Sequence, residues 1–108
     1  MQTKMAFCMY RPKHGKEKAL KELVRQHFPT LKAYELVTDK HNFIAQSEDG
    51  TIIEIFEWTG DSAIDAAHQH PAVTAIWEKM APICDFPVLR ELEEAETSFP
   101  DFKVINLE

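Results

Sequence analysis

The chain of 108 residues has few of the residues that build cross-links or phosphate sites. Its two cysteines, Cys8 and Cys84, are too few for a disulfide framework and have no zinc-ligand spacing. Its three glycines are isolated from one another, so a glycine-rich phosphate loop is excluded. No apolar run approaches the ~20 residues of a membrane-spanning helix, and the first residues do not resemble a signal peptide. We therefore expect a cytoplasmic protein that does not enter a membrane.

Basic residues are also scarce, with 12 Lys and Arg against 18 Asp and Glu and a net charge of −6. Nucleic acids and anionic membranes are bound through an excess of positive charge, so neither partner is expected. The length is that of one domain, which we assign to residues 1–108. The composition, with 44% hydrophobic and 28% charged residues, is typical of an ordinary globular domain.

The spacing of apolar residues predicts strands and helices in the order β-α-β-β-α-β. A short apolar run over 5–10 predicts the first strand. Apolar residues at helical spacing predict an amphipathic helix from about 15 to 27, and Pro29 should end the helix or redirect its last turn. After the central hairpin, the same spacing predicts two helical pieces over about 62–69 and 71–80. The second of these begins with proline, which suits the first turn of a helix.

The central hairpin gives the strongest local signal. Residues 42–48 and 51–58 alternate or run apolar around Asp49-Gly50, which predicts a two-residue type I′ turn. That turn sets the register, and the register assigns each side chain to one face of the sheet. The face expected to line the interior of a dimer carries Phe43, Ala45, Ser47, Ile52, Glu54, Phe56 and Trp58. The face expected to pack on the helices carries Ile44, Gln46, Ile53, Ile55 and Glu57.

The order of elements predicts an α+β fold of the ferredoxin-like kind, an antiparallel sheet with both helices on one face. The last strand has two possible positions, over 86–93 or over 101–107. Such a sheet should be apolar toward its helices and polar toward water, whereas both faces of the predicted hairpin are mostly apolar. We therefore expect a second copy of the chain to cover the other face, making a homodimer.

Two ferredoxin-like sheets packed face to face form a dimeric α+β barrel. Together with this order of elements, Glu54-Ile55-Phe56 on the third strand and Ala67-His68 in the second helix resemble the antibiotic biosynthesis monooxygenase-like domains. The resemblance covers about residues 4–80. It implies the dimeric barrel fold, and the family includes cofactor-independent oxygenases of aromatic substrates as well as haem-degrading members.

Two titratable residues are candidates for catalysis. Glu54 lies in mid-strand among apolar residues, where a desolvated carboxylate acts as a base or as a hydrogen-bonded structural anchor. His68 lies on the apolar stripe of the second helix, where it is a proton shuttle or a structural histidine. His68 and His70 do not share a helix face, so we expect no metal site. The remaining histidines, His14, His27 and His41, are expected in turns or on the surface.

Four aromatic residues are candidates for binding a small aromatic molecule or, alternatively, for packing the core. They are Phe43, Phe56, Trp58 and Trp77. Two functions therefore stay open. One is a cofactor-free, monooxygenase-like or ligand-binding barrel for a small aromatic molecule. The other is a non-catalytic binding or structural dimer whose barrel is filled by side chains.

Overall fold

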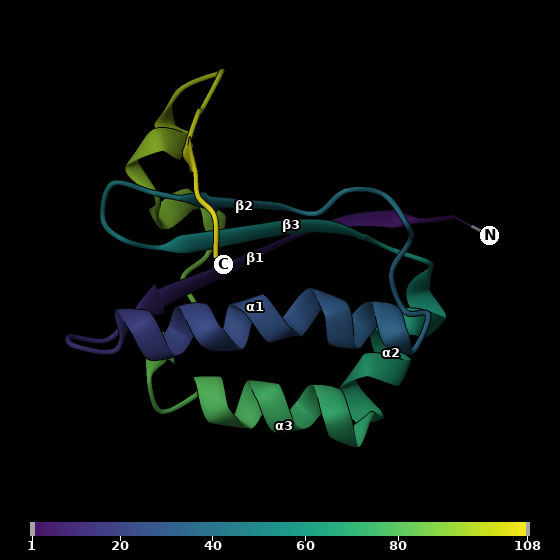
Figure 1. Cartoon of the computed structure of the whole chain (residues 1–108). Coiled ribbons are helices and arrows are strands. Elements are labelled where there is room, and N and C mark those ends of the chain that lie inside the picture. Colours follow the sequence, from purple (N-terminus) through teal and green to yellow (C-terminus); the bar gives the residue numbers. More distant parts are fainter. Residues whose placement is uncertain (1, 108) are drawn as a thin grey trace.

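The computed structural model describes residues 2–107. Within that range the chain forms an antiparallel sheet of five strands and three α-helices, an α+β fold compatible with the ferredoxin-like arrangement (Figure 1). The elements are β1 (Lys4–Pro12), α1 (Glu17–Ala33), β2 (Phe43–Gln46), β3 (Ile52–Trp58), α2 (Asp61–Gln69), α3 (Pro71–Met80), β4 (Cys84–Asp85) and β5 (Lys103–Val104). Two short 3-10 turns, Leu89–Glu91 and Glu93–Glu96, precede β5. The strand order is β4-β1-β3-β2-β5, and Figure 1 shows α1 and α3 together on one face of the sheet.

The helices follow the predicted pattern, with one extension. The two helical pieces expected over 62–69 and 71–80 are confirmed as α2 and α3. Helix α1, however, runs past Pro29 to Ala33, so the predicted end at about residue 27 is wrong. The buried stripe of α1 continues beyond the proline to Leu31, which is fully buried. Burial of that last turn therefore offsets the roughly 3 kcal/mol that proline costs inside a helix.

The predicted two-residue hairpin turn is wrong by one residue. Phe43 pairs with Ile55, so the register is shifted from the one that a two-residue loop would set. The Ser47 N–H donates to the Thr51 carbonyl at 2.9 Å, and the Gly50 N–H donates to the Ser47 carbonyl at 3.0 Å. Gly50 has φ +93°, whereas the two residues before it have negative φ, which excludes a type I′ turn. The loop is a turn of the type I class closed by a Gly50 bulge.

Because the period of a strand is two residues, this slip exchanges the faces of β2 relative to β3. Phe43 lies opposite Ile55, on the face turned away from the helices, so its predicted place beside Glu54 is wrong. The assignment of the faces of β3 is also reversed. Its face toward α1 and α3 is the one that we expected to line a dimer interior, with Ile52, Glu54, Phe56 and Trp58. Its aliphatic face, with Ile53, points to the other side.

Residues 86–107, the C-terminal segment, cover part of this outer face. After β4 the chain crosses to the side of the sheet opposite the helices (Figure 1). There Leu92 is buried against Ala45 and Ile53, and Phe102 packs beside them. The predicted last strand over 86–93 is therefore wrong, because these residues contain a 3-10 turn. The strand within 101–107 exists as β5, but it extends the sheet at the edge of β2, far from β1 in the strand order.

One carboxylate attaches the C-terminal segment to the hairpin. Glu94 accepts a hydrogen bond from the Ser47 hydroxyl at 2.7 Å and another from the Glu48 backbone N–H at 3.0 Å. These bonds, led by the one from the Glu48 N–H, hold the pKa of Glu94 below its usual 4.5. A lowered carboxyl pKa stabilises the attached state above the unfolded pKa, and this stabilisation is lost as the pH falls through the lower, folded value.

We predict that Glu94→Ala detaches the C-terminal segment while leaving the sheet and helices folded. Amide hydrogen exchange should become faster over residues 86–107 and at Glu48. In the wild type, acidification from about pH 5 through the lowered Glu94 pKa should produce the same change. Glu96→Ala, an exposed carboxylate in the same 3-10 turn, is the control. Equal exchange rates in the two variants would contradict the prediction.

Candidate functional site

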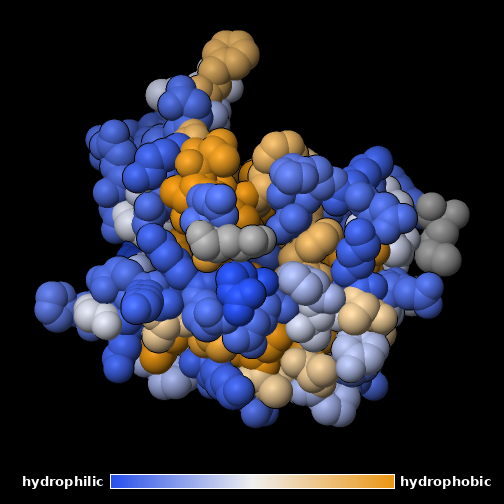
Figure 2. Space-filling view, in the orientation of Figure 1, coloured by the Kyte–Doolittle hydropathy of each residue, from blue (hydrophilic) through white to orange (hydrophobic). Residues whose placement is uncertain are grey.

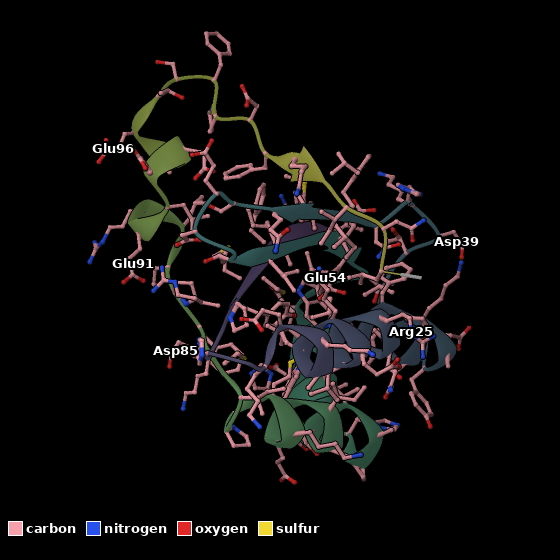
Figure 3. The ribbon with its side chains drawn as sticks, turned by 60° about the vertical axis from the view of Figure 1, so that its left-hand side comes forward. Arg25, Asp39, Glu54, Asp85, Glu91 and Glu96 are labelled. Atoms are coloured by element: carbon pink, nitrogen blue, oxygen red, sulfur yellow. The ribbon has the colours of Figure 1, made fainter. Side chains whose placement is uncertain are left out.

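The buried centre of the molecule is a carboxylate with an incomplete set of partners. Glu54, in the middle of β3, has an exposed fraction of 0% and lies between the sheet and α1 (Figure 3). Its Oε1 accepts a hydrogen bond from the Tyr10 hydroxyl at 2.8 Å and lies 2.8 Å from His27 Nδ1. Its Oε2 is buried and has no hydrogen-bond partner among the residues that the structure describes. Glu54 is thus held firmly at one oxygen only.

Trp77 determines the protonation of His27. The indole Nε1–H of Trp77 donates to His27 Nε2 at 2.9 Å. An indole can only donate, so Nε2 carries no proton and Nδ1 carries the single proton of a neutral imidazole. That Nδ1–H then donates to Glu54 Oε1. We call these four residues, Tyr10, His27, Glu54 and Trp77, the buried cluster.

Four different elements bring the buried cluster together. Tyr10 and Glu54 lie on neighbouring antiparallel strands, and α1 and α3 pack over them with His27 and Trp77. The sequence prediction that His27 is a turn or surface residue is wrong, because His27 is buried on the stripe of α1 that also contains Leu20, Val24 and Leu31. The spacing of these residues, four, three and four positions apart, is the signal in the sequence that marks His27 as a core-facing residue.

A pocket of about 490 Å³ opens beside the buried cluster, at the edge of β1. Two polar members of the cluster and both tryptophans of the chain reach its wall. We call it the aromatic pocket, and its lining residues are Phe7, Cys8, Met9, Tyr10, His27, Trp58, His68, Trp77, Phe86 and Pro87. Most of this lining is apolar or aromatic, which is typical of sites that take small organic ligands.

The pocket is open because β4 is short. Strand β4 pairs only with Arg11 and Pro12 of β1, and within residues 2–107 the rest of that edge, over 4–10, has no strand partner. Pro87 follows two residues after β4 and has no N–H to continue a ladder. The chain therefore leaves the sheet at Phe86, whose ring packs edge-on against Tyr10, and it becomes one wall of the pocket.

Burial and the charge of Glu54 keep the neighbouring acids protonated. Burial, and secondarily the Glu54 charge, raises the pKa of the Cys8 thiol to about 12. The same two causes, in the same order, raise the pKa of Tyr10 well above its usual 10.0. At neutral pH, Cys8 is therefore a thiol rather than a nucleophilic thiolate, and Tyr10 keeps its hydroxyl proton. Both cysteines of the chain are free.

The structure separates the two predicted catalytic residues. Glu54 belongs to the buried cluster and does not line the pocket, whereas His68 lines the pocket from α2. His68 Nδ1 lies 2.9 Å from the Ile64 carbonyl, and its ring meets Trp77 edge-on at 5.1 Å between ring centres. Since a carbonyl only accepts, Nδ1 carries a proton, and neutral His68 has a lone pair at Nε2.

The four predicted binding aromatics divide in the same way. Trp58 and Trp77 line the aromatic pocket. Phe56 is buried behind it, in ring contact with His27 and Phe28, and packs the core. Phe43 lies on the outer face, 53% exposed, so it does not reach this pocket.

Comparison with known proteins adds no assignment. No protein-family profile matches the chain, and no curated protein matches it at a significant level. Within residues 2–107, no group of three or more His, Cys, Asp or Glu side chains is placed to hold a metal ion. None of the helices described is long and apolar enough to cross a membrane. The geometry of the buried cluster and the aromatic pocket is therefore the basis for a functional proposal.

We predict that Tyr10→Phe lowers the free energy of unfolding by about 1.5–3 kcal/mol, the range for a hydrogen bond to a charged group. The variant keeps the ring but leaves the Glu54 carboxylate with His27 as its remaining donor. Glu54→Ala should cost more, about 3–5 kcal/mol, because it removes the centre of the buried cluster. Glu54→Gln keeps an oxygen for both donors and should cost less than Glu54→Ala.

Urea unfolding followed by circular dichroism measures these differences. Tyr34→Phe is the matched control, because it removes the same hydroxyl from a tyrosine that is 47% exposed. If Tyr10→Phe were no less stable than Tyr34→Phe, the Tyr10–Glu54 hydrogen bond would not contribute to folding.

Proposed function

We propose that this protein binds a small aromatic molecule in the aromatic pocket. The observation that carries the proposal is a pocket of about 490 Å³ with an aromatic wall at an open sheet edge, next to buried polar groups. Its volume is in the range of small-molecule sites, about 300–1,000 Å³. Trp58, Trp77 and Phe86 offer ring faces and edges to a planar ligand, and Tyr10 and His68 are the polar groups that would orient it.

Cofactor-independent, monooxygenase-like turnover of that ligand is the catalytic form of the same proposal. Such chemistry needs an apolar pocket and a group that removes a proton, after which an electron-rich anion reacts with dioxygen. The aromatic pocket supplies the apolar surroundings, and His68 lies at its wall together with three members of the buried cluster, Tyr10, His27 and Trp77. The alternative is a non-catalytic binding or structural dimer whose barrel is filled by side chains, and the open aromatic pocket supports the ligand-binding form of the proposal.

The proposal includes a homodimer that forms through the outer face of the sheet. On the outer face of the sheet, Met5 of β1 is 65% exposed and Phe43 of β2 is 53% exposed, and both strands are neighbours of β3. Figure 2 shows a further group of hydrophobic side chains where the C-terminal segment lies against the sheet. Exposed apolar side chains on one face support an interaction surface, and a second copy of the chain is the occupant we propose.

We predict that an aromatic quinone quenches the tryptophan fluorescence of the protein in a saturable manner. Trp58 and Trp77 are the two tryptophans of the chain and both line the pocket, so their emission reports its occupancy directly. With 1,4-naphthoquinone as the probe, Phe86→Ala should weaken binding about two- to tenfold, the equivalent of one aromatic contact of ~0.5–1.5 kcal/mol.

Phe99→Ala is the control for the quenching experiment, because Phe99 is 90% exposed and does not line the pocket. It should bind the quinone as the wild type does. Linear, unsaturable quenching in the wild type would mean that the quinone only collides with the protein, and the proposed binding site would be wrong.

We predict that light scattering of the wild type gives a mass near two chains, since each chain has a mass of 12.5 kDa. The double variant Met5→Lys/Phe43→Lys adds two charges to the outer face and should shift the mass to one chain. Phe99→Lys, which adds a charge at a far more exposed position, should leave the dimer intact. A wild-type mass near one chain at micromolar concentration would exclude the proposed dimer.

A further inference from the structure

Of the two histidines at the pocket wall, His27 has a hydrogen-bond partner on both ring nitrogens. Its Nε2 accepts the Trp77 N–H at 2.9 Å, and its Nδ1–H donates to Glu54 at 2.8 Å. No lone pair of His27 is left to accept a proton from a ligand, and no proton is left to donate. Although His27 lines the pocket, the structure therefore excludes it as a base while Trp77 holds it in this tautomer.

Tyr10 connects the pocket to Glu54. It lines the pocket, and its hydroxyl proton points to Glu54 Oε1 at 2.8 Å. The hydroxyl also interacts with the Cys8 thiol, which leaves one of the two lone pairs of its oxygen to accept from a ligand. Oε1, which accepts the Tyr10 hydrogen bond, is the atom that would receive the proton, and Oε2 is buried without a partner among the described residues, so the anion is incompletely stabilised. Burying an anionic carboxylate costs free energy when one of its oxygens has no hydrogen bond, and protonation of the carboxylate removes that cost.

We propose that the pocket takes an aromatic ligand bearing an acidic hydroxyl, and that Tyr10 and Glu54 together receive the hydroxyl proton. The ligand O–H bond breaks as an O–H bond forms on Tyr10, and the original Tyr10 O–H bond breaks as one forms on Glu54 Oε1. The negative charge thus moves from Glu54 to the bound ligand, with no change of oxidation state. This inference rests on the proposed binding of an aromatic molecule.

Trp77 is the positioning residue in this arrangement. Its N–H occupies His27 Nε2, so that His27 can only donate to Glu54 through Nδ1–H. Glu54 is then the group that accepts the proton coming from the pocket. Without that N–H, His27 Nε2 is free to take a proton itself, and Nδ1, which lies 3.5 Å from the Tyr10 hydroxyl, can compete for the Tyr10 proton. Trp77→Phe should therefore change which group accepts the proton while keeping an aromatic wall in the pocket.

The relay is tested with two chromophoric probes, 4-nitrophenol and its methyl ether, 4-nitroanisole. The ether fits the same pocket but has no proton to lose. At a pH where free 4-nitrophenol is mostly neutral, the wild type should bind both probes and convert the phenol to its visibly coloured phenolate. In Tyr10→Phe and Glu54→Gln, the phenolate fraction of the bound phenol should be at least tenfold smaller than in the wild type.

The outcomes separate the relay from the binding that it depends on. Binding of both probes with the phenol left neutral in the wild type would overturn the relay and leave the binding site standing. Binding of neither probe would overturn the proposed site and the relay with it. A phenolate fraction unchanged in both Tyr10→Phe and Glu54→Gln would assign the proton to another group, and His68→Gln would show whether His68 receives it.

The role of Trp77 has a test that needs no ligand. Nitrogen-15 NMR of the His27 ring should show a protonated Nδ1 and an unprotonated Nε2 in the wild type. Trp77→Phe should shift His27 toward the Nε2–H tautomer or a mixture, and Trp58→Phe, which changes the other pocket tryptophan, should leave the ring unchanged. A protonated His27 Nε2 in the wild type would overturn the assignment.

Discussion

The burial of one carboxylate is the constraint on which the interior of this protein depends. Removing Glu54 from water costs several kcal/mol even after the protein relaxes, so its position requires donors from neighbouring elements. The donors come from Tyr10 on β1 and His27 on α1, and Trp77 on α3 holds His27 in the form that can donate. The same hydrogen bonds therefore join the sheet to two helices and set the polarity of the pocket beside them.

The early end of β4 has consequences on both faces of the sheet. With Pro87 two residues beyond the strand, the edge of β1 stays open over 4–10, and the aromatic pocket has its mouth there. The chain that leaves the sheet crosses to the outer face and buries Leu92 against Ile53. The early end of β4 thus opens the pocket and also reduces the apolar surface that is exposed on the outer face of the sheet.

The errors in the hairpin show where sequence patterns stop being informative. Asp49-Gly50 suits a two-residue type I′ turn, and it equally suits a longer turn that ends in a glycine bulge. A polar face would have selected one register, but β3 is largely apolar on both faces, so a slip of one residue remained consistent with the pattern. The sequence pattern therefore predicts Phe43 on the same face of the sheet as Glu54. It also predicts the helices on the wrong face of β3.

The sequence by itself determined the kinds of elements, the bounds of α2 and α3, and the presence of a carboxylate within an apolar strand. Periodicity carries this information because it records which residues avoid water. Only the tertiary structure decided which element buries each face and which groups bind Glu54. Those partners lie 27 and 44 residues away along the chain, and Trp77 lies 50 residues from His27. Local spacing has no means of encoding contacts at such separations, which depend on how the helices dock on the sheet.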